Sequence, residues 1–223
     1  MANYLIHSCD DRLWYVEQIL IPSMIEQGIE KSAISVYNDV EHLGNLEAFI
    51  QSLITVGQEG GTWHLQDDIV ISKQFRRWTE EYDNGIICGF CNAYSERFPI
   101  GLVKPKDMWY SFQCMRIPND IARHCYYWFK DKKENDEEFY NWAKLKHDDY
   151  IFHRFMERYY ANDSVLNLAP NIVDHIDYLL GGSLINKQRG DMNVRSIHWD
   201  EDDTLHKLIE RLNEVKNEQR TIT

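Results

Sequence analysis

Apolar runs of strand length alternate with amphipathic stretches along the first ninety residues of the chain. The apolar runs lie at residues 4–6, 33–37, 62–71 and 86–89. Between them, apolar residues recur at helical spacing over residues 13–27, 42–55 and 72–82. Strands that alternate with helices pair mostly in parallel, and the helices cover the sheet. The pattern therefore predicts an α/β fold, with a kink in the first helix at Pro22.

Polar side chains follow three of these predicted strands at the point where each strand ends. They occupy positions 8–12, 38–39 and 66–68. In open α/β sheets, ligands bind beyond the carboxyl ends of the strands. We therefore expect the three clusters to share one cleft.

Two adjacent carboxylates, Asp67 and Asp68, interrupt the apolar stretch TWHLQDDIVI at residues 62–71. Fixed side by side they repel each other unless a cation is near, and a hard divalent ion that also binds phosphate oxygens would relieve this. The alternative is a turn followed by the start of a helix, where Asp is favoured without any ligand. The motif alone leaves both interpretations open.

The order of the elements resembles the nucleotide-sugar half of the GT-A glycosyltransferases. Asp39 ends the second strand, and Gln66-Asp67-Asp68 follows the third. The resemblance covers most of residues 1–90 and 145–199, and it implies a GT-A (Rossmann-like) fold with a mostly parallel sheet. In that family a DXD motif holds Mn2+ or Mg2+ against the donor diphosphate, so the same ions and a UDP-sugar donor are implied here. The first motif position is Gln66 rather than an acid, which implies weaker metal binding.

The resemblance also assigns roles to residues farther along the chain. It implies that Asp68 and His175 bind the metal, and that Asp149, with Asp148 second, removes a proton from the acceptor hydroxyl in an inverting transfer. The residues implied for donor binding are Asp39, Arg12, Asp67, Arg189 and Arg195. Each has a plainer interpretation: the acidic pair suits a helix start, the histidine a core position, and the later arginines a solvated surface.

A basic and aromatic segment, residues 97–133, fits the strand and helix alternation poorly. It carries eight basic and three acidic residues, whereas the whole chain has a net charge of -12. We expect it to be an insertion over the sheet edge on the acceptor side, with Trp109, Arg116 and Arg123 as acceptor-side candidates. Basic residues interleaved with rings suit a nucleic-acid groove. The alternative is that the rings are core and the lysines solvated.

The opening of the chain, YLIHSCDDRLWYVEQILIPSMIEQGI, is similar to that of small phage-encoded glycosyltransferases that modify DNA. This likeness implies a hydroxymethylated pyrimidine as the acceptor, flipped out of the DNA stack. A saccharide or cell-surface glycan is the alternative acceptor. A nucleic-acid-binding module without catalysis is the alternative from another class.

We expect a single domain, because 223 residues suit one core. Its expected parts are the nucleotide-sugar half (1–96), the insertion (97–133), the catalytic helix and metal loop (134–199) and a C-terminal helix (200–223). The apolar stripe of that last helix is interpreted as packing or as a homodimer face. No long apolar run or leader is visible, which favours a cytoplasmic protein, in the host cytoplasm if it is phage-encoded.

The five cysteines are expected to be reduced thiols, since their number is odd and their spacing irregular. A zinc site made of Cys88, Cys91, Cys114 and either His124 or Cys125 is the alternative.

Overall fold

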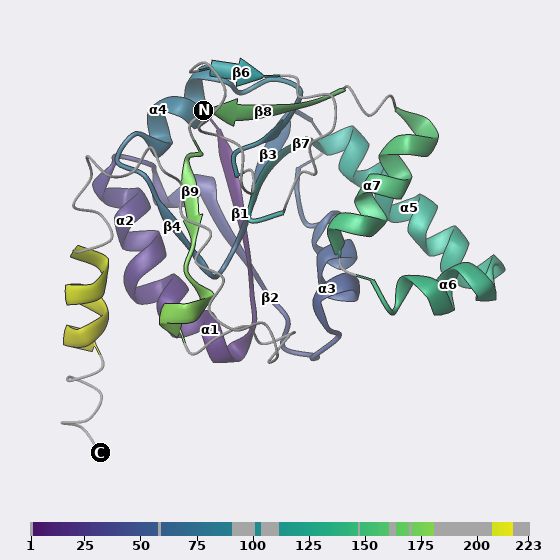
Figure 1. Cartoon of the computed structure of the whole chain (residues 1–223), viewed down its shortest axis with the longest axis horizontal. Coiled ribbons are helices and arrows are strands. Elements are labelled where there is room, and N and C mark those ends of the chain that lie inside the picture. Colours follow the sequence, from purple (N-terminus) through teal and green to yellow (C-terminus); the bar gives the residue numbers. More distant parts are fainter. Residues whose placement is uncertain are drawn as a thin grey trace.

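The computed structural model of the chain (Figure 1) describes residues 2–57, 59–90, 101–103, 112–146, 148–160, 164–169, 171–180 and 207–215. One sheet has the strand order β2-β1-β3-β7-β5-β8-β6. Its strands are β1 (Asn3–Ser8), β2 (Ile34–Asn38), β3 (Gly61–Gln66), β5 (Ile86–Cys88), β6 (Gly101–Val103), β7 (Cys114–Pro118) and β8 (Val165–Ala169). Only β7 and β6 run against the other five strands. The predicted α/β fold with a mostly parallel sheet is confirmed.

A separate two-stranded ribbon lies beside the main sheet. It pairs β4 (Ile69–Ile71) with β9 (Val173–His175) in antiparallel fashion, with Ile69 opposite His175. The hydroxyl of Tyr15 donates to Ile69 O at 2.7 Å and anchors the ribbon to the first helix. The ribbon therefore begins three residues after β3 ends and brings a late segment of the chain to that point.

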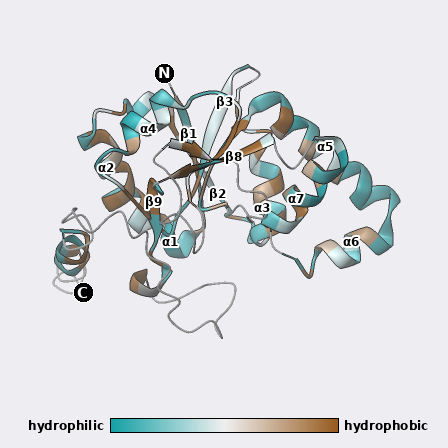
Figure 2. Cartoon of the chain, turned by 45° about the horizontal axis from the view of Figure 1, so that its top comes forward, coloured by the Kyte–Doolittle hydropathy of each residue, from teal (hydrophilic) through white to brown (hydrophobic). Residues whose placement is uncertain are grey.

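Helices cover both faces of the sheet (Figure 2). They are α1 (Asp10–Tyr15), α2 (Ile21–Glu26), α3 (Asn45–Ser52), α4 (Phe75–Glu81), α5 (Asn119–Asn135), α6 (Glu137–Ala143) and α7 (Asp148–Tyr159), with short 3-10 turns at Lys31–Ala33 and Asp177–Leu180. Apolar side chains of α1, α2 and α4 form one core with the sheet, and those of α3, α5 and α7 form the other. In the described part of the chain, no helix is long and apolar enough to cross a membrane.

The first helix adapts to Pro22 by a local change of hydrogen bonding. A π-helical turn, Val16–Leu20, joins α1 to α2, and the N–H of Ile21 bonds to Val16 O. Proline lacks an N–H and clashes with the carbonyl of the preceding turn, which a wider turn relieves. The helix therefore continues through the position at which a kink was predicted.

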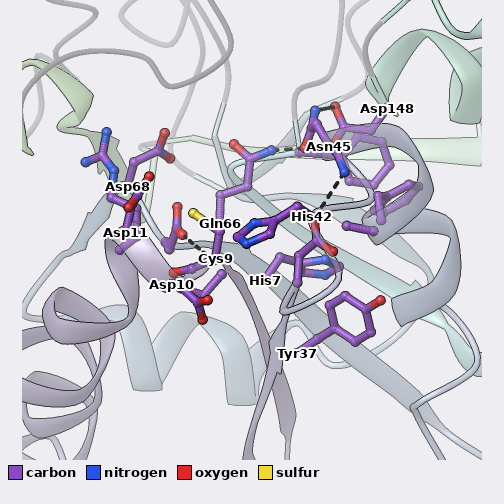
Figure 3. A pocket seen from close by; sticks show the side chains of 18 residues that line it. His7, Cys9, Asp10, Asp11, Tyr37, His42, Asn45, Gln66, Asp68 and Asp148 are labelled. Atoms are coloured by element: carbon purple, nitrogen blue, oxygen red, sulfur yellow. Dashed lines mark hydrogen bonds between the residues drawn. The ribbon is translucent and has the colours of Figure 1, made fainter.

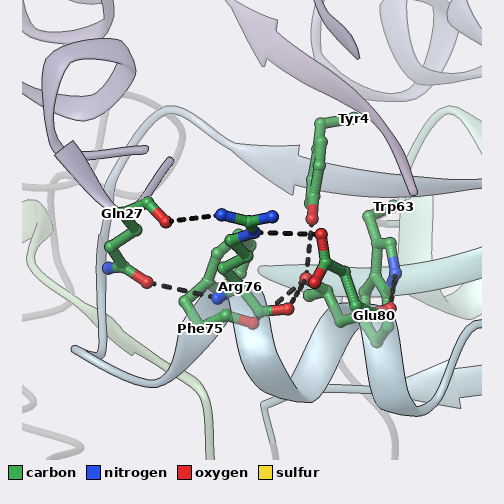
Figure 4. A network of polar contacts seen from close by, with 7 residues as sticks. Tyr4, Gln27, Trp63, Phe75, Arg76 and Glu80 are labelled. Atoms are coloured by element: carbon green, nitrogen blue, oxygen red, sulfur yellow. Dashed lines mark hydrogen bonds and ion pairs between the residues drawn. The ribbon is translucent and has the colours of Figure 1, made fainter. Parts of the chain in front are cut away.

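Polar bonds fasten α4 to the strands that lead to the site (Figure 4). Tyr4 of β1 bonds to Thr79 Oγ1 at 2.7 Å, and the Trp63 indole of β3 donates to Thr79 O at 3.3 Å. At the start of the helix, Arg76 N donates to Gln27 Oε1 at 3.2 Å. These bonds tie α4 to β1, to β3 and to the end of α2.

The basic and aromatic segment is largely a part of the sheet and core, which corrects the expectation of an insertion over the sheet edge. Only β6 lies at the edge, whereas β7 pairs between β3 and β5 in the centre. Of its described rings, Phe112, Trp128 and Phe129 are buried. The first four residues of β7 are buried, as expected for a central strand that is covered on both faces.

The C-terminal helix contributes to the first core. The structure describes its residues 207–215, and Leu208, Leu212 and Val215 are buried members of that core. These three residues of the stripe therefore pack within the chain, and the homodimer face stays a prediction.

Candidate active site

A cavity of about 340 Å³ opens where β1, β2 and β3 end (Figure 3). The register explains why these strand ends meet: β1 lies between the other two, with Ser8 beside Asn38 and His7 beside Gln66. Residues that follow all three strands line the cavity, together with the start of α3, Phe112 and Asp148. The expectation of one shared cleft is confirmed for the residues 8–12, Asp39 and 66–68.

The wall of this cavity is strongly acidic. Six carboxyl groups line the cavity together with the buried Arg12, those of Asp10, Asp11, Asp39, Asp67, Asp68 and Asp148. An anionic ligand such as a diphosphate would be repelled by such a wall unless a cation came with it. The charge balance therefore favours ligands that bind together with a cation.

Asp67 and Asp68 form the turn between β3 and β4, so they do not begin a helix. Cys9 N donates to Asp67 Oδ2 at 3.3 Å, and His175 Nε2 lies 3.0 Å from Asp68 Oδ2. Ile176 N also donates to the Asp68 carbonyl at 2.8 Å. The ribbon thus brings the two predicted metal ligands, Asp68 and His175, into contact across 107 positions of sequence.

The surroundings of Asp67 and Asp68 shift the pKa values of the two carboxyl groups in opposite directions. Burial and the neighbouring Asp68 raise the pKa of Asp67 above its usual value. Burial would also raise the pKa of Asp68, but His175 and Arg12 lower it overall, and Asp68 in turn raises the pKa of His175. Asp68 therefore loses its proton at a lower pH than Asp67 does.

The side chains around Asp68 provide some, but not all, of the ligands that a divalent cation with a preference for oxygen needs. Asp68 Oδ1 is buried and has no hydrogen-bond partner among the described residues, which leaves one carboxylate oxygen available. Within the same residues, no three His, Cys, Asp or Glu side chains are grouped as a ready metal shell. Such a cation would therefore take its other ligands from water or from a bound phosphate, as Mg2+ commonly does.

Asp148 lies on the wall of the cavity at the start of α7. Its side chain is buried, and it accepts from Asn45 Nδ2 at 3.0 Å and from Gln66 Nε2 at 3.4 Å. Burial and the nearby Asp149 carboxylate raise the pKa of Asp148 to about 7. A carboxyl group with a pKa near neutrality is suited to accept a proton from a hydroxyl group.

This raised pKa predicts a stability effect that depends on pH. Between about pH 4 and 7 the unfolded chain releases the Asp148 proton while the folded protein keeps it, so stability falls as pH rises through this window. Asp148→Asn removes the buried charge. We expect the free energy of unfolding of the variant minus that of wild type to be about 2 kcal/mol larger at pH 8 than at pH 5. Urea unfolding at both pH values measures this. An equal difference at both would contradict the raised pKa.

Asp39 organises the loop that leads into α3. Its carboxylate accepts from Leu43 N at 2.9 Å and from Gly44 N at 3.1 Å. Gly44 has a φ of 85°, a conformation that favours glycine. The predicted donor contact of Asp39 stays a prediction, while its role in shaping this part of the cavity wall is visible.

Several other predicted site residues lie outside the cavity or outside the described residues. Asp149, the preferred base in the sequence analysis, is half-buried and is not among the residues that line the cavity. Trp109, Arg189 and Arg195 lie outside the described residues. The structure therefore moves the preference within the acidic pair to Asp148.

Arg116 and Arg123, predicted on the acceptor side, lie near the start of β3, at the end opposite the cavity. Arg116 is buried, donates to Asp83 Oδ1 at 2.6 Å and to Gly85 O at 2.7 Å, and pairs with Trp63 in the sheet. Arg123 donates to the carbonyl of Gly57, ahead of β3. Arg116 in particular is part of the framework.

Arg116→Met should therefore affect stability and leave the cavity intact. It leaves Asp83 without its partner and the Gly85 carbonyl without its donor, so we expect a loss of about 3 kcal/mol. Urea unfolding measures the loss. A normal free energy of unfolding together with impaired ligand binding would restore the acceptor-side role.

His7 lines the cavity and contacts His64, and neither was among the predicted site residues. His7 Nε2 lies 3.0 Å from His64 Nδ1, and the His7 ring stacks on Phe49 at 5.8 Å between centroids. Burial lowers the pKa of His7 to about 4 and that of His64 well below its usual value, so both are neutral at neutral pH. The sequence signal that could have pointed to His64 is the alternation of side chains along a strand, which places His64 and Gln66 on the same face of β3.

The cysteines that the structure describes away from the cavity are buried. Cys88, Cys114 and Cys125 are free thiols, and burial raises the pKa of both Cys114 and Cys125. Cys91, which the zinc alternative requires, lies outside the described residues. Burial in apolar surroundings keeps such thiols protonated and unreactive.

Fold and site together define an α/β protein with an acidic ligand cleft at its strand ends. The sequence matches no protein-family model and no curated protein. Among solved structures, it is similar to the galactosyltransferase LgtC in complex with donor and acceptor sugar analogues, at 13% identity over 96% of this chain and 95% of that chain, with a TM-score of 0.49. An active-site mutant of LgtC matches at 12% identity over the same shares, with a TM-score of 0.45.

A proposed glucose-1-phosphate thymidylyltransferase from Bacillus anthracis is also similar, at 11% identity over 78% of this chain and 89% of that chain, with a TM-score of 0.41. At these identities and TM-scores the likeness does not identify the reaction, which has to be inferred from the site.

Proposed function

We propose that this chain is a glycosyltransferase that moves a sugar from a nucleotide-sugar donor to an acceptor hydroxyl. One observation carries the proposal: a single cavity holds the crowded carboxylates Asp67 and Asp68 together with the buried Asp148, whose pKa is near 7. Sugar transfer needs a group that manages the charge of the leaving diphosphate and a base that takes the acceptor proton. The cavity offers residues for both tasks.

The first task falls to the turn after β3. Asp68, with Asp67 beside it and His175 from the ribbon, would hold Mn2+ or Mg2+, and a UDP-sugar is the donor we propose. When bound, the ion would neutralise charge that develops on the departing diphosphate. Arg12, buried in the same wall, would add a positive charge to the donor side.

The second task falls to Asp148. Its carboxylate would accept the proton of the acceptor hydroxyl, and Asn45 and Gln66 hold that carboxylate on the cavity wall. A base separate from the diphosphate-binding turn suits inversion at the sugar carbon. We therefore propose an inverting transfer with Asp148 rather than Asp149 as the base.

We propose that the acceptor is a saccharide hydroxyl, in preference to a hydroxymethylated pyrimidine in phage DNA. The cavity wall is acidic, and the two described arginines expected to line a nucleic-acid groove, Arg116 and Arg123, lie near the other end of β3. Nucleic-acid binding depends on basic groups that neutralise phosphates. The charge distribution therefore supports a neutral sugar better than a polyanion.

A thermal-shift panel of nucleotide sugars, each with and without Mn2+, tests the proposal. We expect one donor to raise the melting temperature only when the ion is present, and we expect that donor to release its nucleoside diphosphate when a saccharide acceptor is added. Modified and unmodified DNA serve as alternative acceptors in the same assay. DNA binding that survives Asp68→Ala, with no release from any donor, would instead indicate a binding module without catalysis.

A further inference from the structure

The carboxyl group of Asp148 is held by two neutral amides that come from different elements of the fold. Asn45 Nδ2 donates to Oδ1 at 3.0 Å, and Gln66 Nε2 donates to Oδ2 at 3.4 Å. All three side chains lie on the wall of the cavity (Figure 3). Each oxygen of this buried carboxyl group therefore has its own uncharged donor.

The charge of the donors decides what such a pair of contacts can do. A hydrogen-bond donor favours the ionised carboxylate over the protonated acid, and so it opposes the effect of burial. A lysine or arginine in either place would lower the pKa much further and leave a weak base. A carboxylate at position 66 would repel Asp148 from 3.4 Å away. An amide avoids both outcomes, which gives Gln66 a physical reason to be neither acidic nor basic.

The backbone fixes the position of both amides. Gln66 is the last residue of β3 and pairs with His7 of β1. Asn45 is the first residue of α3, and the loop before it is held by the bond from Gly44 N to the Asp39 carboxylate. A sheet and an anchored helix start therefore present the two donors to Asp148, which itself begins α7.

We propose that Asn45 and Gln66 are positioning residues that orient the Asp148 carboxylate toward the acceptor and favour its ionised form. The proposal rests on the proposed function, in which Asp148 is the base. Other titratable groups also face this region: Asp149 lies on the same helix, and His7, His42 and Asp67 line the same cavity. The test therefore has to observe Asp148 itself.

Titration of the Asp148 carboxyl group by NMR provides that observation, because its carbon resonance is assigned by its loss in Asp148→Asn. Gln66→Leu and Asn45→Leu each remove one donor, and we expect each to raise the pKa of Asp148 by up to about one pH unit. Gln66→Glu keeps the shape and adds a like charge, so it should raise the pKa further. If the pKa is the same in all three variants and in wild type, the proposal is overturned.

Enzyme kinetics then separate positioning from a structural role. We expect the acid limb of the kcat profile to move to higher pH by the shift that NMR records, with KM for the donor unchanged. Asn135→Leu is the matched control, because it removes an amide that donates to Asp131 at 2.9 Å on the exposed side of α5. If wild type transfers no sugar but the NMR shifts appear, the proposed function fails while the contacts still tune Asp148. Unmoved kinetics in an active enzyme with shifted NMR values would overturn the positioning role.

Discussion

Asp68→Asn should abolish the stabilisation that a nucleoside diphosphate and Mn2+ give together. A ligand present at 100 times its Kd stabilises a protein by about 2.7 kcal/mol, which corresponds to a shift of about 5–10 °C for a domain of this size. The variant loses the carboxylate whose Oδ1 is buried and has no partner among the described residues, so the ion loses its main ligand. Differential scanning fluorimetry with and without the ion measures the effect.

Asp11→Asn is the matched control for this experiment. It makes the same chemical change in the same cavity, but Asp11 is exposed and lies in the first turn of α1 rather than in the turn after β3. We expect it to keep most of the shift. A full shift in Asp68→Asn would show that the ion and donor bind without this carboxylate, and the proposed ligand set would be wrong.

Asp148→Asn should lower kcat by roughly 10²–10⁴, the range that a positioned general base supplies. Binding of the donor should change little, because Asp148 contacts Asn45 and Gln66 rather than the turn that holds Asp67 and Asp68. Initial rates at saturating donor, measured from pH 5 to 9, give kcat and the position of the acid limb.

Asp149→Asn serves as the comparison in the same assay. This residue lies beside Asp148 on α7 but does not line the cavity, so we expect a loss of less than about 10-fold. A larger loss in Asp149→Asn than in Asp148→Asn would return the base to the residue that the sequence resemblance favoured. The free energy of unfolding of Asp148→Asn, measured at pH 5 and pH 8, separates lost activity from unfolding.

The parts of the fold that depend on local pattern were predictable from the sequence. Alternating strands and helices over the first ninety residues predicted the α/β class, and polar residues after three strands predicted a shared cleft. These predictions succeeded because strand ends in a parallel sheet meet at one edge, whatever the details of packing. The contact between Asp68 and His175 was also anticipated, although through the family resemblance rather than through the residues alone.

The parts that depend on distant pairing could not be derived from local pattern. β7 lies centrally between β3 and β5 but stands in a segment rich in bases and rings, so it was interpreted as an insertion. Arg116 is an example. The sequence alone does not distinguish a buried arginine that donates to two acceptors within the protein from an arginine that faces a ligand. The choice of Asp148 over Asp149 needed the orientation of α7, which spacing along the chain does not reveal.

The ribbon of β4 and β9 lies apart from the main sheet and has only three residues in each strand, so few backbone bonds hold it together. Local opening of the ribbon should therefore require less free energy than global unfolding. A ligand that binds Asp68 and His175 together would oppose this opening. Hydrogen exchange at Val70 and Asp174, which face each other as a hydrogen-bonded pair, should then slow in proportion to occupancy. A true ligand could therefore be found by exchange mass spectrometry before any reaction is known.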